Sequence, residues 1–148
     1  MAVVRFSAEH ISAAARIEAE TFSEPWSADA LKLLLGENYP SFAVCEGDEL
    51  VAYIGTARSL DELQILTVAT DTHARRRGYA KEILAHLDTY AKENGIFSVS
   101  LEVRESNAAA IALYESCGYK TAGVRKNFYR FPTENALVMI KILITNER

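Results

Sequence analysis

A basic turn between a strand and a helix constrains the fold of this chain more than any other feature. Residues 62–70 have the composition of a strand, the turn Arg75-Arg76-Arg77-Gly78-Tyr79-Ala80 follows, and an amphipathic helix then runs to Asn94-Gly95. The helix has an apolar stripe at helical spacing, made of Ala80, Ile83, Leu84, Leu87 and Ala91. Such a stripe packs on a sheet. Because a second strand is expected at 97–104, the unit is predicted to be a right-handed crossover between parallel strands.

The other segments place this crossover in a mixed sheet. Further strands are expected at 1–6, 41–46, 50–58, 119–129 and 136–144, and the loop Gly47-Asp48-Glu49 makes a hairpin of 41–46 and 50–58. Helices are expected at about 7–22, with one face made of Ile11, Ala15, Glu18 and Phe22, at about 28–35 after the cap Ser27, and at 108–117. The predicted fold is a single α/β domain over residues 1–148, with a mixed, mostly antiparallel sheet of six to seven strands flanked by about four helices.

Length, charge and hydrophobicity narrow the possible functions. With 148 residues, 49% of them hydrophobic, the chain has enough apolar surface for one ordinary domain. A net charge of −4 argues against a nucleic-acid-binding protein that relies on a broad basic face. The sequence has neither a signal region at its start nor an apolar run near the ~18 residues that span a membrane. We therefore expect a cytoplasmic protein with no membrane partner.

The cysteine and histidine residues predict neither a disulfide framework nor a metal site. Cys45 and Cys117 are too few for such a framework and form no CxxC pair, so buried free thiols are expected. His10, His73 and His86 lie far apart in the sequence and lack the close spacing of metal ligands.

The basic turn has the properties of an anion-binding site. A helix N-terminus presents unpaired N–H groups and about half a positive charge, which suits a phosphate or pyrophosphate. Gly78 permits a positive φ and the small Ala80 permits close approach, while the arginines can add charge-assisted hydrogen bonds. The alternative is a solvated basic run in a loop. The chain has neither a GxxxxGK(S/T) motif nor a GxGxxG motif after its first strand, so the ligand is not expected to be bound as ATP or NAD are.

Glu102 and Tyr114 are candidates for acid–base chemistry. Glu102 lies on the polar face of the strand at 97–104, whose other face is a continuous apolar row. Because that strand should be interior to the sheet, its carboxylate is expected to face a cleft, where partial removal from water favours a general base. The alternative is a solvating charge at a sheet edge. Tyr114 is either a core residue or a proton donor at the core edge, and Asn107 is first a helix cap.

Together these features resemble the GNAT family of acetyl-CoA-dependent N-acetyltransferases. The residues Arg75-x-x-Gly78-x-Ala80 at a strand-to-helix turn match the family's pyrophosphate-binding pattern, (Q/R)-x-x-G-x-(G/A). The order of expected strands and helices is similar to the family's fold over nearly the whole chain. The resemblance implies acetyl-CoA as the co-substrate and no metal.

A closer resemblance, to the bacterial ribosomal-protein alanine N-acetyltransferases (the RimI type), lies in four segments. They are Pro25-Trp26-Ser27 and the residues at 101–104, 106–116 and 125–129. This resemblance implies that Glu102 is the general base and Tyr114 the general acid. It also implies three groups of binding residues: Val68, Ala69 and Thr70 for the pantetheine arm and thioester; Arg75, Arg76, Arg77, Gly78, Tyr79, Ala80, Lys81 and Asn107 for the rest of the cofactor; Trp26 and Tyr129 for the acceptor.

The sequence departs from the proteins that it resembles in two places, one that concerns the acceptor and one in the cofactor strand. The segment from Tyr129 to Ala136 is shorter than the usual loop, and Asn135 stands where an aspartate is common. Thr70 replaces the usual valine, a change that backbone contacts should tolerate. The hypothesis is acetyl transfer to the free α-amine of a protein N-terminus, alanine of a ribosomal small-subunit protein, without direct nucleic-acid binding. The alternatives are a small amine, polyamine or lysine side chain as acceptor, or a non-catalytic acyl-CoA-binding domain.

Overall fold

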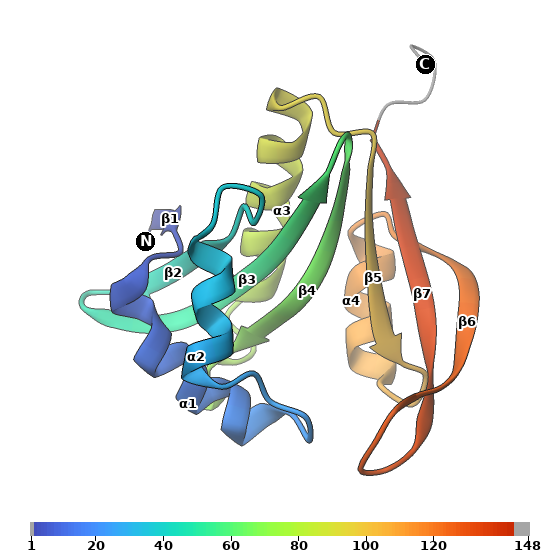
Figure 1. Ribbon diagram of the computed structural model, residues 1–148, viewed down its shortest axis with the longest axis horizontal. Helices are drawn as coiled ribbons and strands as arrows, with labels where there is room; N and C mark the ends of the chain where they lie inside the picture. The colour runs from blue at the N-terminus through green and yellow to red at the C-terminus, as the bar shows by residue number, and fades with distance from the viewer. Residues whose placement is uncertain (1, 144–148) are drawn as a thin grey trace.

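A seven-stranded sheet runs through the computed structural model, which describes residues 2–143 (Figure 1). The spatial order is β1-β2-β3-β4-β5-β7-β6. The strands are β1 (Ala2–Arg5), β2 (Phe42–Glu46), β3 (Glu49–Ser59), β4 (Glu62–Thr70), β5 (Ser98–Arg104), β6 (Lys120–Tyr129) and β7 (Glu134–Ile142). The helices are α1 (Ile11–Thr21), α2 (Ala28–Leu31), α3 (Tyr79–Glu93) and α4 (Ala108–Ser116), with short 3₁₀ turns η1 (Ala8–His10), η2 (Lys32–Leu35) and η3 (Thr72–Ala74).

The predicted fold class is confirmed. β4 and β5 pair in parallel, and every other neighbouring pair of strands in the described sheet is antiparallel. The connection from β4 through α3 to β5 is the expected crossover. The predicted ends of the first and last strands, Met1 and Ile144, lie outside the described residues. Within residues 2–143, no helix is both long and apolar enough to cross a membrane.

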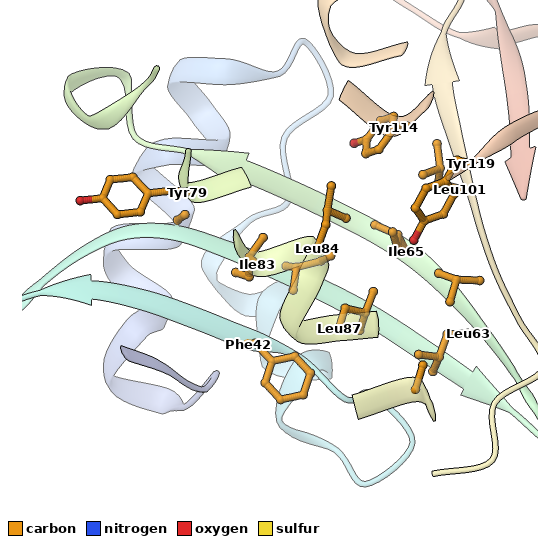
Figure 2. Packing of buried hydrophobic residues seen from close by; sticks show 14 of the residues in the cluster. Phe42, Leu63, Ile65, Tyr79, Ile83, Leu84, Leu87, Leu101, Tyr114 and Tyr119 are labelled. Atoms are coloured by element: carbon orange, nitrogen blue, oxygen red, sulfur yellow. The ribbon is translucent and has the colours of Figure 1, made fainter. Parts of the chain in front are cut away.

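The sheet carries a hydrophobic core on each face. In Figure 1, α1 and α2 lie in front of the sheet, and α3 and α4 lie behind it. Apolar residues of α3 pack on residues of β2, β4 and β5 behind the sheet, and Figure 2 shows this cluster around Phe42, Leu63, Ile83, Leu87 and Leu101. The core in front is formed by residues of α1, α2, β2 and β3, with Phe6, Ile17, Leu31, Leu34 and Tyr53 at its centre.

β4 and β5 part after a short paired stretch, and this opening positions the functional site. Only three residue pairs join them, from Glu62↔Ser98 to Gln64↔Ser100. Beyond them the register of β4 with β3 shifts, so that Leu66 is left without a partner. Such a bulge bends a strand and increases its twist. The two strands therefore separate toward their C-terminal ends, as Figure 1 shows.

The alternation predicted for β5 is confirmed. Val99, Leu101 and Val103 are buried on one side, and Glu102 and Arg104 are half-buried on the other. β5 lies between β4 and β7, so it is interior to the sheet as expected.

The predicted buried face of α1 is wrong by one residue. Ala14, Ile17 and Glu18 are buried, whereas Phe22 is 36% exposed. The reason is that the helix ends at Thr21: Phe22 has an extended backbone, with φ −115° and ψ 147°, and no longer follows the helical face.

Two predicted boundaries near the front of the sheet also change. The expected three-residue hairpin loop is a two-residue turn, because Gly47 adopts a φ of 62° and Glu46 pairs directly with Glu49. The helix expected at 28–35 is one α-helical turn, α2, followed by η2. Its predicted cap is confirmed, since Ser27 Oγ accepts a hydrogen bond from the Ala30 N–H at 3.0 Å.

Candidate active site

A cleft of about 1020 Å³ occupies the opening between β4 and β5. Its walls are the end of β4, the turn before α3, the side of α4, the end of β5 and two connecting segments, 21–26 and 128–132. With the exception of Arg77, every residue that the sequence predicts for the site lines this cleft. These are Trp26, Val68, Ala69, Thr70, Arg75, Arg76, Gly78, Tyr79, Ala80, Lys81, Glu102, Asn107, Tyr114 and Tyr129.

One end of the cleft is the uncapped N-terminus of α3. Gly78 precedes the helix with a φ of 81° and offers no side chain to cap it. The first helical hydrogen bond runs from Glu82 N–H to Gly78 O at 3.0 Å, so the N–H groups of Tyr79, Ala80 and Lys81 have no partner within the helix. Together with the helix dipole, these three groups form a site that favours a negatively charged ligand.

The arginines of this turn point in different directions. Arg75 lies against the cleft wall, where its Nε donates to Thr70 O and one Nη donates to Thr21 Oγ1, both at 3.4 Å. Arg76 has a positive φ of 66° and lines the cleft. Arg77 turns away from it and lies 3.7 Å from the carboxylate of Glu46 on β2. Of the three arginines, two therefore face the cleft.

The end of β4 offers backbone groups to the cleft. Asp71 N–H donates to Val51 O at 2.8 Å, and Ala69 is the partner of Tyr53 in the same antiparallel ladder. Because hydrogen-bonding direction alternates along such a ladder, the N–H and C=O of Ala69 are directed toward β3. Those of Val68 and Thr70 are directed toward β5, where the cleft has replaced the neighbouring strand. These groups can pair with the amides of an extended ligand.

Glu102 lies on the opposite wall and has two partners. Its Oε1 accepts from Gln64 Nε2 at 3.1 Å, and its Oε2 lies 3.1 Å from Arg125 Nε. The Glu102 side chain is 14% exposed, whereas that of Arg125 is 59% exposed. The sequence analysis gave this carboxylate no partner, whereas the structure gives it a charged one from β6, on the far side of β7.

Two tyrosines bring phenol groups to the same cleft. Tyr114 is buried on α4 and its ring stacks edge-to-face with that of Tyr119, at the edge of the cluster in Figure 2. Burial raises the pKa of Tyr114, and the neighbouring Tyr129 contributes to the increase. Because Tyr114 lines the cleft, its hydroxyl can donate to a ligand bound there. Burial raises the pKa of Tyr129 to about 12, and the negative charge of Glu102 is the second-largest cause of the increase.

Asn107 has the capping role that the sequence predicts. Its Oδ1 accepts from Ala110 N–H at 3.1 Å and so caps α4. The residue also lines the cleft, which leaves its amide NH₂ close to a ligand bound there.

Two residues of the cleft were missed by reasoning from the sequence. Glu18 was assigned to an apolar helix face, although a charged residue at a core position already indicates buried partners. Arg104 lies in one of the segments similar to the RimI-type proteins, at 101–104. The alternation of the strand does not predict its hydrogen-bond partners, which come from other segments. Nothing in the part of the chain that the structure describes gathers three or more His, Cys, Asp or Glu residues to hold a metal ion.

Comparisons with known proteins show the family of this chain. The acetyltransferase (GNAT) family model matches residues 11–119. The [ribosomal protein bS18]-alanine N-acetyltransferase of Escherichia coli K12 is 37% identical over 133 residues, which cover 87% of this chain and 88% of the relative. A putative [ribosomal protein bS18]-alanine N-acetyltransferase of Bacillus subtilis is 34% identical over 140 residues, or 93% of each chain.

A solved structure gives the same result for the fold. The crystal structure of the ribosomal-protein-S18-alanine N-acetyltransferase from E. coli superposes with a TM-score of 0.92 at 32% identity, covering 99% of this chain and 97% of that one. The chain belongs to the acetyltransferase (GNAT) family. It is an acetyl-CoA-dependent N-acetyltransferase.

Proposed function

We propose that this enzyme transfers acetyl from acetyl-CoA to the free α-amine of a protein N-terminus, with an alanine of a ribosomal small-subunit protein as acceptor. One observation carries the chemistry: a single cleft contains a carboxylate, a protonated phenol and an uncapped helix N-terminus. The names of the relatives, which cover most of this chain, support the choice of acceptor. Such an acceptor makes the enzyme cytoplasmic.

The cofactor would occupy the β4 side of the cleft. The free N–H groups of Tyr79, Ala80 and Lys81 would bind the pyrophosphate, helped by the charges of Arg75 and Arg76. The backbone of Val68 and Thr70 would pair with the pantetheine amides, and an N–H of this edge would polarise the thioester carbonyl as negative charge develops on its oxygen. Asn107 would contact the cofactor through its free amide NH₂.

Glu102 and Tyr114 would move the protons of the reaction. An α-amine has a pKa of about 7.7–8.0, so much of it must lose a proton before it can attack at neutral pH. Glu102 would take that proton, directly or through water. The amine nitrogen then bonds to the thioester carbon, the C–S bond breaks, and Tyr114 donates to the departing sulfur. Burial keeps this phenol protonated at neutral pH, because it raises the pKa of Tyr114.

The acceptor amine must share Glu102 with its present partners. Arg125 and Gln64 each contact one carboxylate oxygen. Arg125 is the more exposed and can turn toward solvent when an ammonium group arrives. Trp26 and Tyr129, at the acceptor end of the cleft, would contact the first residues of the peptide.

The test is acetylation of a panel of peptides with free N-termini, with products identified by mass spectrometry. Glu102→Gln and Tyr114→Phe are each expected to lower turnover by about 10²- to 10⁴-fold without loss of acetyl-CoA binding. Matched controls are Glu115→Gln, an exposed glutamate on α4, and Tyr90→Phe, on α3 outside the cleft. Wild-type turnover in both active-site variants would refute the acid–base roles. Activity only on an N-terminally blocked peptide that contains lysine would refute the α-amine acceptor.

A further inference from the structure

Arg104, the last residue of β5, joins two segments that are far apart in the sequence. One Nη donates to Pro132 O at 2.9 Å and to Glu134 Oε1 at 3.1 Å. The other donates to Ser23 Oγ at 2.8 Å and to Arg130 O at 2.6 Å. The Arg104 side chain is only 22% exposed, although the segments that it bonds are at the surface. One guanidinium thus holds the α1–α2 connection and the β6–β7 turn together.

The same two segments also contact each other directly. Ser23 Oγ donates to Arg130 O at 3.2 Å, and Arg130 N–H donates to Glu24 Oε1 at 2.7 Å. Both segments lie at the end of the molecule where β5 terminates (Figure 1). We call residues 22–24 and 129–132, with Arg104 between them, the acceptor bridge. Most of its members line the cleft.

The bridge depends on Arg104 because its other parts have little packing of their own. Residues 22–25 are exposed, and so is Phe131. A guanidinium offers five donors in a planar fork, which lets it bond two segments at once. A lysine ammonium at this position would keep the charge but could not reproduce the fork.

Arg104 also orients Tyr129. The guanidinium carbon lies 4.6 Å from the centre of the Tyr129 ring, within the range of a cation–π contact. The Tyr129 ring also packs edge-on against the ring of Phe128, with 5.0 Å between the two ring centres. Substitution of Arg104 should therefore change the position of Tyr129, while the contacts of Glu102 and of the β4 side of the cleft stay the same.

We propose that Arg104 is a positioning residue for the acceptor. It fixes the acceptor bridge and the Tyr129 ring, and so sets the width of the passage through which the amine reaches Glu102. The inference rests on the proposed function, because it takes this end of the cleft as the acceptor side. Arg104 is not a catalytic residue: it acts through Ser23, Tyr129 and Arg130.

The experiment compares Arg104→Lys with the wild type in steady-state kinetics. The KM for the N-terminal peptide is expected to rise about tenfold or more, since several charge-assisted bonds are lost, while the KM for acetyl-CoA stays within about twofold. Arg58→Lys is the matched control: Arg58 also donates to two carbonyl groups, Leu60 O and Asn94 O, but lies outside the cleft. An unchanged peptide KM in Arg104→Lys, or an equal rise in both KM values, would overturn the proposal.

Hydrogen exchange supplies a readout that does not depend on the acceptor. The amide of Arg130, which bonds to Glu24, is expected to exchange faster in Arg104→Lys and at the wild-type rate in Arg58→Lys. If the wild type acetylates no N-terminal peptide, the proposed function fails, and exchange at Arg130 still decides whether Arg104 holds the bridge. Unchanged exchange at Arg130 would overturn the positioning role itself.

Discussion

Replacement of Glu18 by glutamine should destabilise the enzyme through a mismatch of hydrogen-bond donors. The Glu18 side chain is fully buried, and three donors converge on it. Its Oε2 accepts from Tyr53 Oη at 2.6 Å and from Thr67 Oγ1 at 2.5 Å, and its Oε1 accepts from Trp26 N–H at 3.0 Å. A carboxylate only accepts, so it satisfies all three. Burial and the Glu18 charge raise the pKa of Tyr53, which keeps this phenol protonated as a donor.

The magnitude follows from the number of donors left without an acceptor. A glutamine has one acceptor oxygen, so its NH₂ must face either the Trp26 N–H or the two hydroxyl groups. If it faces the hydroxyl groups, their oxygens can accept from it, but their protons then need other acceptors; Ala14 O, 3.5 Å from Tyr53 Oη, is one for Tyr53. An unsatisfied buried polar group costs about 1–3 kcal/mol, and we expect a loss of about 2 kcal/mol in the free energy of unfolding. Tyr53→Phe removes one donor and leaves the carboxylate two, so it should cost about 1 kcal/mol.

Urea unfolding of the two single variants and the double variant measures this directly. If the mismatch is the cause, the double variant should lose less than the sum of the single losses, because removal of the Tyr53 hydroxyl leaves fewer donors for the introduced amide to face. The m-value should not change. A Glu18→Gln variant within about 0.3 kcal/mol of the wild type, or strictly additive losses, would refute the reasoning.

Two further predictions concern the turn before α3. Arg16 bonds to Asp71 at 2.9 Å and holds the pKa of that carboxyl below its ordinary value, so the native state binds fewer protons than the unfolded state. This stabilisation is complete above the unfolded pKa of about 3.9 and is lost as the pH falls through the lower folded pKa. The deficit of Asp71→Asn relative to the wild type, measured by urea unfolding, should therefore shrink between pH 6 and 3; a deficit that grows would contradict this. Arg76→Met should weaken acetyl-CoA binding by about tenfold in calorimetry, whereas Arg77→Met should change it by less than about twofold. Equal effects would show that Arg77 leaves Glu46 to bind the cofactor.

The crossover could be predicted from the sequence because its signals are local. The alternation in β5 and the stripe on α3 each repeat over several residues, and Gly78 marks the turn by its permitted φ. The resemblance then assigned roles to residues that periodicity leaves ambiguous, such as Tyr114.

Long-range partners could not be predicted in the same way. Arg125 reaches Glu102 across β7, and the sequence pattern does not reveal that β7 lies between β5 and β6. Arg104 meets Ser23, which is 81 residues away in the chain, through side-chain contacts that form only when the sheet is assembled. The partners of Glu18 could not be predicted either, because Tyr53 and Thr67 come from two different strands of the sheet.

The parting of β4 and β5 leaves an open strand edge in the middle of the sheet. Open edges invite strands of other chains and are a common start of aggregation. Here the edge lies in the floor of a cleft, between the α3 turn, α4 and the segment that holds Trp26. The bulge at Leu66 further disrupts its regular pairing. The walls of the cleft surround this edge, and a narrow extended ligand with amide groups could enter and pair with it.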